Sequence, residues 1–135
     1  MTSFRFYPGE YRIRPVNADW ELQGCAALRR AVFCDEQGLF QDDDSDAIDP
    51  NALHIAALGC VLAQPEQVVG TVRIHESQPG IQPGVWMGSR LAVHNDFRCD
   101  HALGHKLIRH AVRLAHARGC HQFFAHVQIK NAPLF

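Results

Sequence analysis

The segment His101–Arg118 constrains the fold more than any other part of the sequence. Its apolar residues recur every three or four positions, with basic residues on the opposite side, a pattern typical of an amphipathic helix that covers a buried surface. Gly119 follows directly and is a common helix terminator. Apolar or alternating segments lie on both sides, at Val85–Val93 and Cys120–Gln128. The sequence therefore predicts a strand–helix–strand unit within a sheet.

Further elements are expected upstream of this unit. Glu10–Val16 alternates apolar and polar residues, and Leu53–Ala63 and Gln67–Glu76 predict a hairpin with its turn at Pro65 and Glu66. A Pro/Gly-rich loop, Gln78–Gly84, is expected before the fourth strand. The first helix should be capped by Asn17 or Asp19 and carry the apolar residues Leu22, Ala26, Leu28, Ala31, Val32 and Phe33. A short helical turn at Glu36–Phe40 completes a mixed α/β, or α+β, single domain.

The composition supports a folded protein. The 135 residues are 47% hydrophobic and 20% charged, which suits one packed domain and excludes a disordered chain. No apolar run approaches the roughly 18 residues that span a membrane, and the N-terminus has no apolar signal-peptide core. The five cysteines are odd in number and widely spaced, so reduced thiols and a cytoplasmic location are expected. A formal net charge of −1 argues against nucleic-acid binding through bulk charge.

The charges are unevenly distributed. Seven of the fourteen acidic residues lie in Asp35–Asp49, a stretch without lysine or arginine, whereas Trp86–Phe135 holds seven Lys/Arg and two Asp. These are either two solvated faces or a site that joins an anionic ligand to a cationic one. The aspartate run Asp42–Asp49 is correspondingly either a flexible loop that attracts a cationic amine or a solvated loop.

No metal site is expected. The aspartate run has the spacing of an EF-hand loop, but Ala47 replaces the required glycine and Leu53 the bidentate glutamate. His101 and His105 are four residues apart on the predicted helix, which is a ligand spacing. No suitable third ligand accompanies them, so surface or phosphate-facing histidines explain the pair more simply.

The junction Leu91–Gly104 is the first candidate for chemistry. A strand passes through a short loop into a helix N-terminus, where free backbone N–H groups and the positive end of the helix dipole favour a phosphate. Ala102 and Gly104 are small, and Arg98, His101 and His105 add positive charge.

Several segments in order resemble the GNAT superfamily of N-acetyltransferases. With Gly104 as the final glycine, the junction is similar to the family motif Gln/Arg-x-x-Gly-x-Gly/Ala, and Cys99 and Ala102 stand at its first two signature positions. Arg29–Gly38 resembles an Arg-x-x-Val-Phe-x-x-Glu-Gln segment of a branch that includes relatives of acyl-homoserine-lactone synthases. Gly70–Ile74 and Ser89–Val93 follow in that branch's order. The whole is similar to the bacterial acetyltransferase domain associated with nitrogen starvation.

The resemblance implies an acyl-CoA N-acyltransferase-like fold, in which helices flank a central sheet that is mixed and mainly antiparallel. It implies an enzyme that transfers acetyl from acetyl-coenzyme A to the primary amine of a small molecule. It implies donor contacts at Leu91, Ala92, Val93, Arg98, Cys99, Asp100, His101, Ala102, Leu103, Gly104, His105 and Asn131. It implies an acceptor side formed by Phe33, Glu36, Gln37, Arg73 and Arg90.

Acetyl transfer to an amine needs a base for the ammonium and an acid for the departing thiolate. His54, His75 and Glu76 are the candidates, with Glu76 preferred as the base; alternatively, the two histidines are ordinary polar strand positions and Glu76 is a solvated carboxylate.

The resemblance also implies a further helix and two strands after Asn131, whereas this chain stops at Phe135. We therefore expect residues 1–135 to form one domain with an open sheet edge, at which a second copy could pair. Two alternatives to an enzyme stay open: a non-catalytic acyl-coenzyme-A-binding module, which Cys99 and Ala102 favour, and a structural domain of a longer protein.

Overall fold

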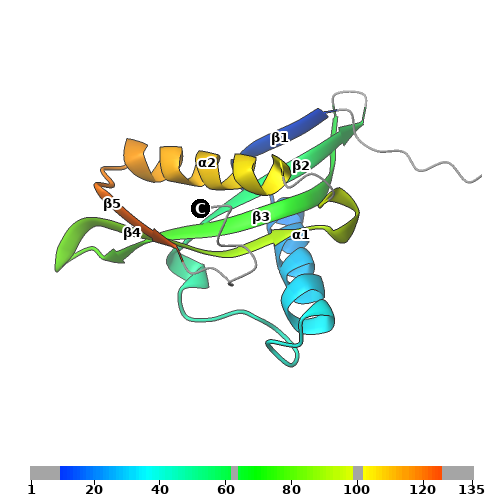
Figure 1. Ribbon diagram of the computed structural model, residues 1–135, viewed down its shortest axis with the longest axis horizontal. Helices are drawn as coiled ribbons and strands as arrows, with labels where there is room; N and C mark the ends of the chain where they lie inside the picture. The colour runs from blue at the N-terminus through cyan, green and yellow to red at the C-terminus, as the bar shows by residue number, and fades with distance from the viewer. Residues whose placement is uncertain (1–9, 62–63, 99–101, 126–135) are drawn as a thin grey trace, which may run out of the picture.

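Five strands form one sheet in the computed structural model, which describes residues 10–61, 64–98 and 102–125 (Figure 1). β1 (Glu10–Pro15), β2 (Leu53–Val61), β3 (Gln64–Gln78) and β4 (Gln82–Val93) follow one another in antiparallel pairs. After a helical crossover, β5 (Gln122–Ala125) pairs with β4 in parallel. The predicted sheet, mixed and mainly antiparallel, is confirmed.

The strands around the hairpins are longer than the sequence predicts. β3 begins at Gln64, so the predicted turn residues Pro65 and Glu66 lie inside the strand. A register shift beside the Cys60–Pro65 pair accommodates the proline, which strands tolerate near their ends and at irregularities. β4 likewise begins at Gln82, so the predicted loop Gln78–Gly84 is reduced to a turn at 79–81.

Two helices cover opposite faces of this sheet. α2 (Ala102–Ala117) packs on one face through Leu103, Leu107, Ala111 and Ala115, as its apolar stripe predicts. α1 (Asp19–Arg29) packs on the other face. Successive residues of β2 alternate between the two cores: Ile55 and Ala57 face α2, whereas Ala56 and Leu58 face α1. Burial of both faces explains why β2 is almost continuously apolar. No helix in the described ranges is long and apolar enough to cross a membrane.

The start of α1 differs from the prediction. Neither Asn17 nor Asp19 caps the helix with its side chain, because Glu21 reaches back from the first turn instead. Its Oε2 accepts hydrogen bonds from the backbone N–H groups of Asn17 (3.1 Å) and Ala18 (3.0 Å). This fully buried carboxylate also pairs with Arg14 of β1. Glu21 thus satisfies backbone donors at the helix entry and ties α1 to the sheet.

The end of the helical segment also differs. α1 passes directly into a π-helical stretch, Arg30–Glu36, and the expected separate turn at Glu36–Phe40 does not form. The wide π-helical turn buries Val32, Phe33 and Cys34 in succession.

The expected apolar stripe of α1 is only partly correct. Leu22, Ala26 and Ala31 are exposed, because two charged residues, Glu21 and Arg29, occupy the inward face beside Cys25 and Leu28. Their ion pairs allow this burial.

Candidate functional site

β4 contains an irregularity where the predicted donor and acceptor sides meet. The register with β3 passes from Arg73↔Ser89 to Thr71↔Ala92, so two residues, Arg90 and Leu91, lie opposite one. This is a β-bulge, which bends the strand and redirects its backbone groups. Arg90 has a φ of 55°, in the left-handed region. Residues other than glycine, asparagine and aspartate seldom occupy this region.

Beyond the bulge, β4 presents an edge. Within the described residues, β5 pairs only with Val85–Gly88, so it does not cover Ser89–Val93. The predicted donor contacts Leu91, Ala92 and Val93 therefore lie on a stretch of β4 that is not paired with β5 in the part of the chain that the structure describes. The carbonyl of Val93 already accepts a hydrogen bond from Arg98 Nε at 2.7 Å.

A short loop and α2 follow this edge. Ala102 begins the helix, Leu103 and Gly104 are buried, and His105 is exposed. The predicted contacts Cys99, Asp100, His101 and Asn131 lie outside the described residues.

Arg98 joins the two predicted sides of the site. Its guanidinium makes a bidentate ion pair with Glu36, with Nη1–Oε1 at 2.5 Å and Nη2–Oε2 at 2.9 Å. Glu36 ends the π-helical segment, so this pair connects the loop after β4 to the chain after α1. Both side chains are partly exposed. An anion that bound Arg98 would have to displace the Glu36 carboxylate or share the guanidinium with it.

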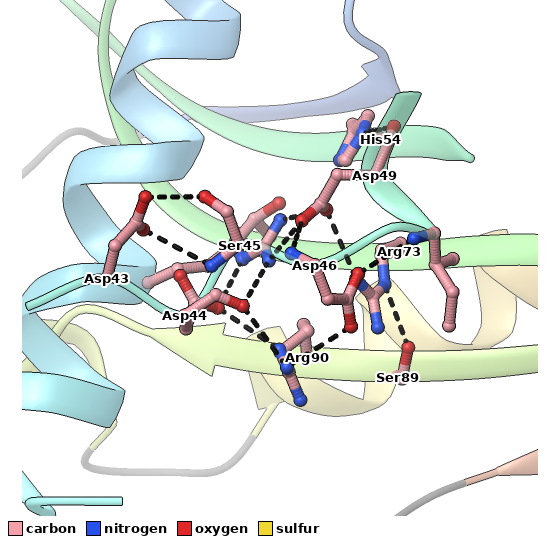
Figure 2. Close-up of polar contacts among 12 residues, drawn as sticks. Asp43, Asp44, Ser45, Asp46, Asp49, His54, Arg73, Ser89 and Arg90 are labelled. Carbon is pink, nitrogen blue, oxygen red and sulfur yellow. Dashed lines mark hydrogen bonds and ion pairs between the residues drawn. The ribbon is translucent and has the colours of Figure 1, made fainter. Parts of the chain in front are cut away.

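Three arginines and three aspartates form a closed ring on the α1 side of the sheet, which we term the Asp–Arg ring (Figure 2). Each arginine joins a different pair of aspartates: Arg29 binds Asp44 and Asp49, Arg73 binds Asp46 and Asp49, and Arg90 lies beside Asp44 and Asp46. The arginines come from α1, β3 and β4. The aspartates come from the aspartate run Asp42–Asp49, which we term the aspartate loop and which ends where a short 3-10 helix, Asp49–Asn51, begins. The ring therefore binds that loop to three separate elements.

The distances in the ring are short. Arg29 Nε lies 2.7 Å from Asp44 Oδ2, and its Nη1 lies 2.7 Å from Asp49 Oδ1. Arg73 Nη1 lies 2.7 Å from Asp46 Oδ1, while its Nε donates to Ser89 Oγ at 3.0 Å. The side chains of Arg29, Arg73 and Asp44 are each at most 6% exposed, so solvent screens these pairs little.

The arginines favour the ionised form of two aspartates of the ring, Asp46 and Asp49. Burial opposes ionisation of Asp49, but hydrogen bonds and charge from Arg29 prevail and hold the pKa of that carboxyl well below its usual range. Asp46 follows the same pattern. Burial acts to raise its pKa, but the hydrogen bond and charge of Arg73 have the larger combined effect, so the pKa lies below its usual value. The two expectations for the aspartate run, an amine-attracting loop or a solvated one, are wrong for Asp44 and Asp49, because internal arginines neutralise them. Asp46 is exposed but paired with Arg73, whereas Asp42 and Asp43 are exposed, as the solvated alternative expects.

The three predicted acid–base residues lie in two different places. His75 and Glu76 line an open cavity of about 560 Å³ together with Trp86 and Arg118. Oε2 of Glu76 accepts a hydrogen bond from the Gly84 N–H at 2.8 Å.

His54 lines a separate cavity of about 280 Å³ between α1 and the aspartate loop, where its Nε2 lies 3.0 Å from the Asp49 carbonyl oxygen. Glu76 is four residues along β3 from Val72, the position opposite the bulge, which corresponds to roughly 13 Å.

The predicted acceptor residues are likewise divided. Phe33 is buried in the core under α1, and Arg73 is buried in the Asp–Arg ring. Glu36 faces Arg98, Gln37 is half-buried, and Arg90 forms the bulge. Among the described residues, no group of three or more His, Cys, Asp or Glu side chains is placed to hold a metal ion.

Sequence reasoning missed the Asp–Arg ring. The available signal was a single arginine inside each of two largely apolar strands, Arg73 and Arg90, opposite an arginine-free aspartate run. Buried charges inside a sheet need partners of opposite charge, and the aspartate run is the richest source of carboxylates in the sequence.

Comparison with known proteins supplies the family. Residues 23–134 match the acetyltransferase (GNAT) family. No curated protein matches. A candidate N-acetyltransferase from Lactobacillus plantarum has a similar structure, with a TM-score of 0.74, 22% identity, and coverage of 90% of this chain and 77% of that one.

Two further structures are similar. An aminoglycoside acetyltransferase from an uncultured soil metagenomic sample, in complex with sisomicin, has a TM-score of 0.67, 19% identity, and coverage of 90% of this chain and 80% of that one. The AHL synthase LasI has a TM-score of 0.70, 14% identity, and coverage of 93% and 76%. At these identities the likeness establishes the fold.

Proposed function

Because this chain belongs to the acetyltransferase (GNAT) family, we propose that it transfers the acetyl group of acetyl-coenzyme A to the primary amine of a small molecule. The observation that carries this proposal is the β4 bulge at Arg90–Leu91, next to an edge, Ser89–Val93, that is not paired with β5 in the described part of the chain. An extended ligand can add to such an edge through backbone hydrogen bonds.

The donor is expected to lie between this edge and the start of α2. Leu91 and Ala92 offer backbone groups along the edge, and the N-terminal turn of α2, with Leu103, Gly104 and His105, offers backbone N–H groups to a pyrophosphate. Arg98 supplies positive charge beside them once Glu36 releases it. These groups fit an extended arm that ends in phosphates. The assignments of Cys99, Asp100, His101 and Asn131 stay predictions.

When bound, the donor supplies an activated thioester. The protein's part is to orient that group and to stabilise the negative charge that develops on its carbonyl oxygen as the amine attacks. A backbone N–H at the bulge is suited to this, since a fixed dipole in a partly desolvated site needs no reorganisation. A base must also hold the proton that the ammonium loses.

For that base, Glu76 stays the leading candidate, with His75 beside it and His54 as the alternative; because Glu76 lies roughly 13 Å along β3 from the bulge, the proton would have to reach it through bound water. Support comes from the open cavity that Glu76 and His75 share and from the hydrogen bond that fixes Glu76. We expect Glu76→Gln to leave acetyl-coenzyme A binding unchanged and to lower turnover about tenfold or more near neutral pH. Equal turnover in steady-state assays would remove Glu76 from this role.

The acceptor is proposed only as a class. An aminoglycoside acetyltransferase shares the fold, which supports a small-molecule amine without identifying one. The resemblance to the nitrogen-starvation domain, and the cytoplasmic location inferred from the cysteines, also stay predictions. So does pairing of a second copy along β5, where Phe124 is 49% exposed; sedimentation at increasing concentration tests it.

Calorimetric titration with acetyl-coenzyme A tests the proposal. Micromolar binding followed by thiol release with a panel of amines supports an acetyltransferase. Binding without turnover of any amine would favour the acyl-coenzyme-A-binding module, and absence of binding would favour a structural domain.

A further inference from the structure

Arg90 combines an unfavourable backbone conformation with an extensively held side chain. It is the only non-glycine residue with positive φ in the described part of the chain. Bulges that require this conformation usually carry glycine, which adopts it without steric cost. A side chain retained here therefore implies that its contacts compensate for the strained backbone.

The polar contacts of Arg90 all come from two residues of the aspartate loop, Asp44 and Asp46. Arg90 Nε lies 3.2 Å from Asp44 Oδ2, and its Nη2 donates to the Asp44 carbonyl at 3.1 Å and to Asp46 Oδ2 at 3.4 Å. The guanidinium also lies over the ring of Phe40, 4.6 Å from its centroid. A side chain held by two aspartates and an aromatic face is poorly available to bind a substrate anion.

The groups that hold Arg90 are themselves fixed. Asp44 is 1% exposed and is bound by Arg29 of α1, while Asp46 is bound by Arg73 of β3 (Figure 2). Removing Arg90 would leave Arg29 and Arg73 bound to the loop through Asp44, Asp46 and Asp49. The loop would stay docked, whereas the bulge would lose its only charged connection to the ring among the described residues.

We propose that Arg90 is a positioning residue: the aspartate loop, acting through the Arg90 side chain, holds the β4 bulge in its reactive conformation. The aspartate loop and the backbone N–H groups at the bulge are thereby coupled. This inference rests on the proposed acetyl transfer, because it assigns Arg90 a purpose in that reaction.

The test compares Arg90→Ala and Arg90→Gly with Arg113→Ala, the same truncation at an exposed position on α2. We expect both Arg90 variants to lower kcat about tenfold to a hundredfold, with the amine KM and the Kd of coenzyme A changed less than about threefold. Arg113→Ala should match the wild type. An unchanged kcat in both Arg90 variants, or a raised amine KM at unchanged kcat, would overturn the proposal; the latter result would make Arg90 a substrate ligand.

Two further measurements keep the inference testable by other routes. Hydrogen exchange of the Ala92 amide, which lies next to the bulge and pairs with Thr71 of β3, should be about tenfold faster in Arg90→Ala, with β2 unaffected, whether or not any amine is turned over. Unchanged exchange refutes the positioning role even if the proposed function fails. If the Arg90 truncations do not fold, Phe40→Leu, which removes only the stacked ring, should still lower kcat severalfold, and unchanged turnover in that variant counts against the proposal.

Discussion

Replacing Arg29 by methionine should destabilise the protein strongly, although no ligand contact is involved. The guanidinium is 6% exposed and binds Asp44 and Asp49 at 2.7 Å each. Methionine retains the apolar stem and removes the charge, so Asp44, at 1% exposure, keeps only Arg90 at 3.2 Å. Removing one partner of a buried pair costs about 3–5 kcal/mol. Because each aspartate keeps one other arginine, we expect the lower end, about 3 kcal/mol.

This loss is large enough to measure. With an unfolding entropy of about 2 cal/mol/K per residue, a 135-residue domain should lose about 10 °C of Tm. Urea unfolding followed by tryptophan fluorescence and circular dichroism gives the free energy of unfolding directly. The matched control is Arg30→Met, the same change at the neighbouring exposed residue, which should cost less than about 0.5 kcal/mol.

The outcome is decisive in either direction. If Arg29→Met unfolds within about 1 kcal/mol of Arg30→Met, the Asp–Arg ring is not a closed buried network in solution. The account of how the aspartate loop docks would then be incorrect, along with the role assigned to its arginines.

Three further predictions concern donor binding and pH. Glu36→Gln should tighten coenzyme A binding about two- to fivefold in calorimetry, because it frees Arg98 from an exposed ion pair, whereas the neighbouring Asp35→Asn should not. His105→Glu should weaken that binding by placing negative charge in the first turn of α2, while His116→Glu in the last turn should leave it unchanged. The lowered pKa values of Asp46 and Asp49 stabilise the folded state above about pH 4, and this stability should be lost as the pH falls below that value, a loss that acid titration of the unfolding free energy detects.

Local periodicity was sufficient to predict the sheet and its long helix. The stripe of α2 matches the face that this helix buries against the sheet, and Gly119, with a φ of 94°, follows the end of the helix as expected. The strands β1 and β3 form where alternation predicts them, although the middle of β3 is buried on both faces. The predicted boundaries failed at Pro65 and at the start of α1, because a strand pair and a glutamate from the helix outweighed the local turn and cap preferences.

The candidate site was predictable only where it is contiguous in sequence. The β4 edge and the start of α2 adjoin in the chain, so the resemblance could assign predicted donor contacts to both. The pairing of Arg98 with Glu36, 62 residues apart, has no local signal.

The sequence alone therefore determined the order of strands and helices and the family, because these depend on hydrophobic spacing and on short ordered motifs. The tertiary structure decided which charges are buried and what holds Arg90 in a left-handed conformation. The physical reason is that an ion pair depends on distance in space: Asp44 and Arg90 are 46 residues apart, and only the packing of the loop on β4 brings them together.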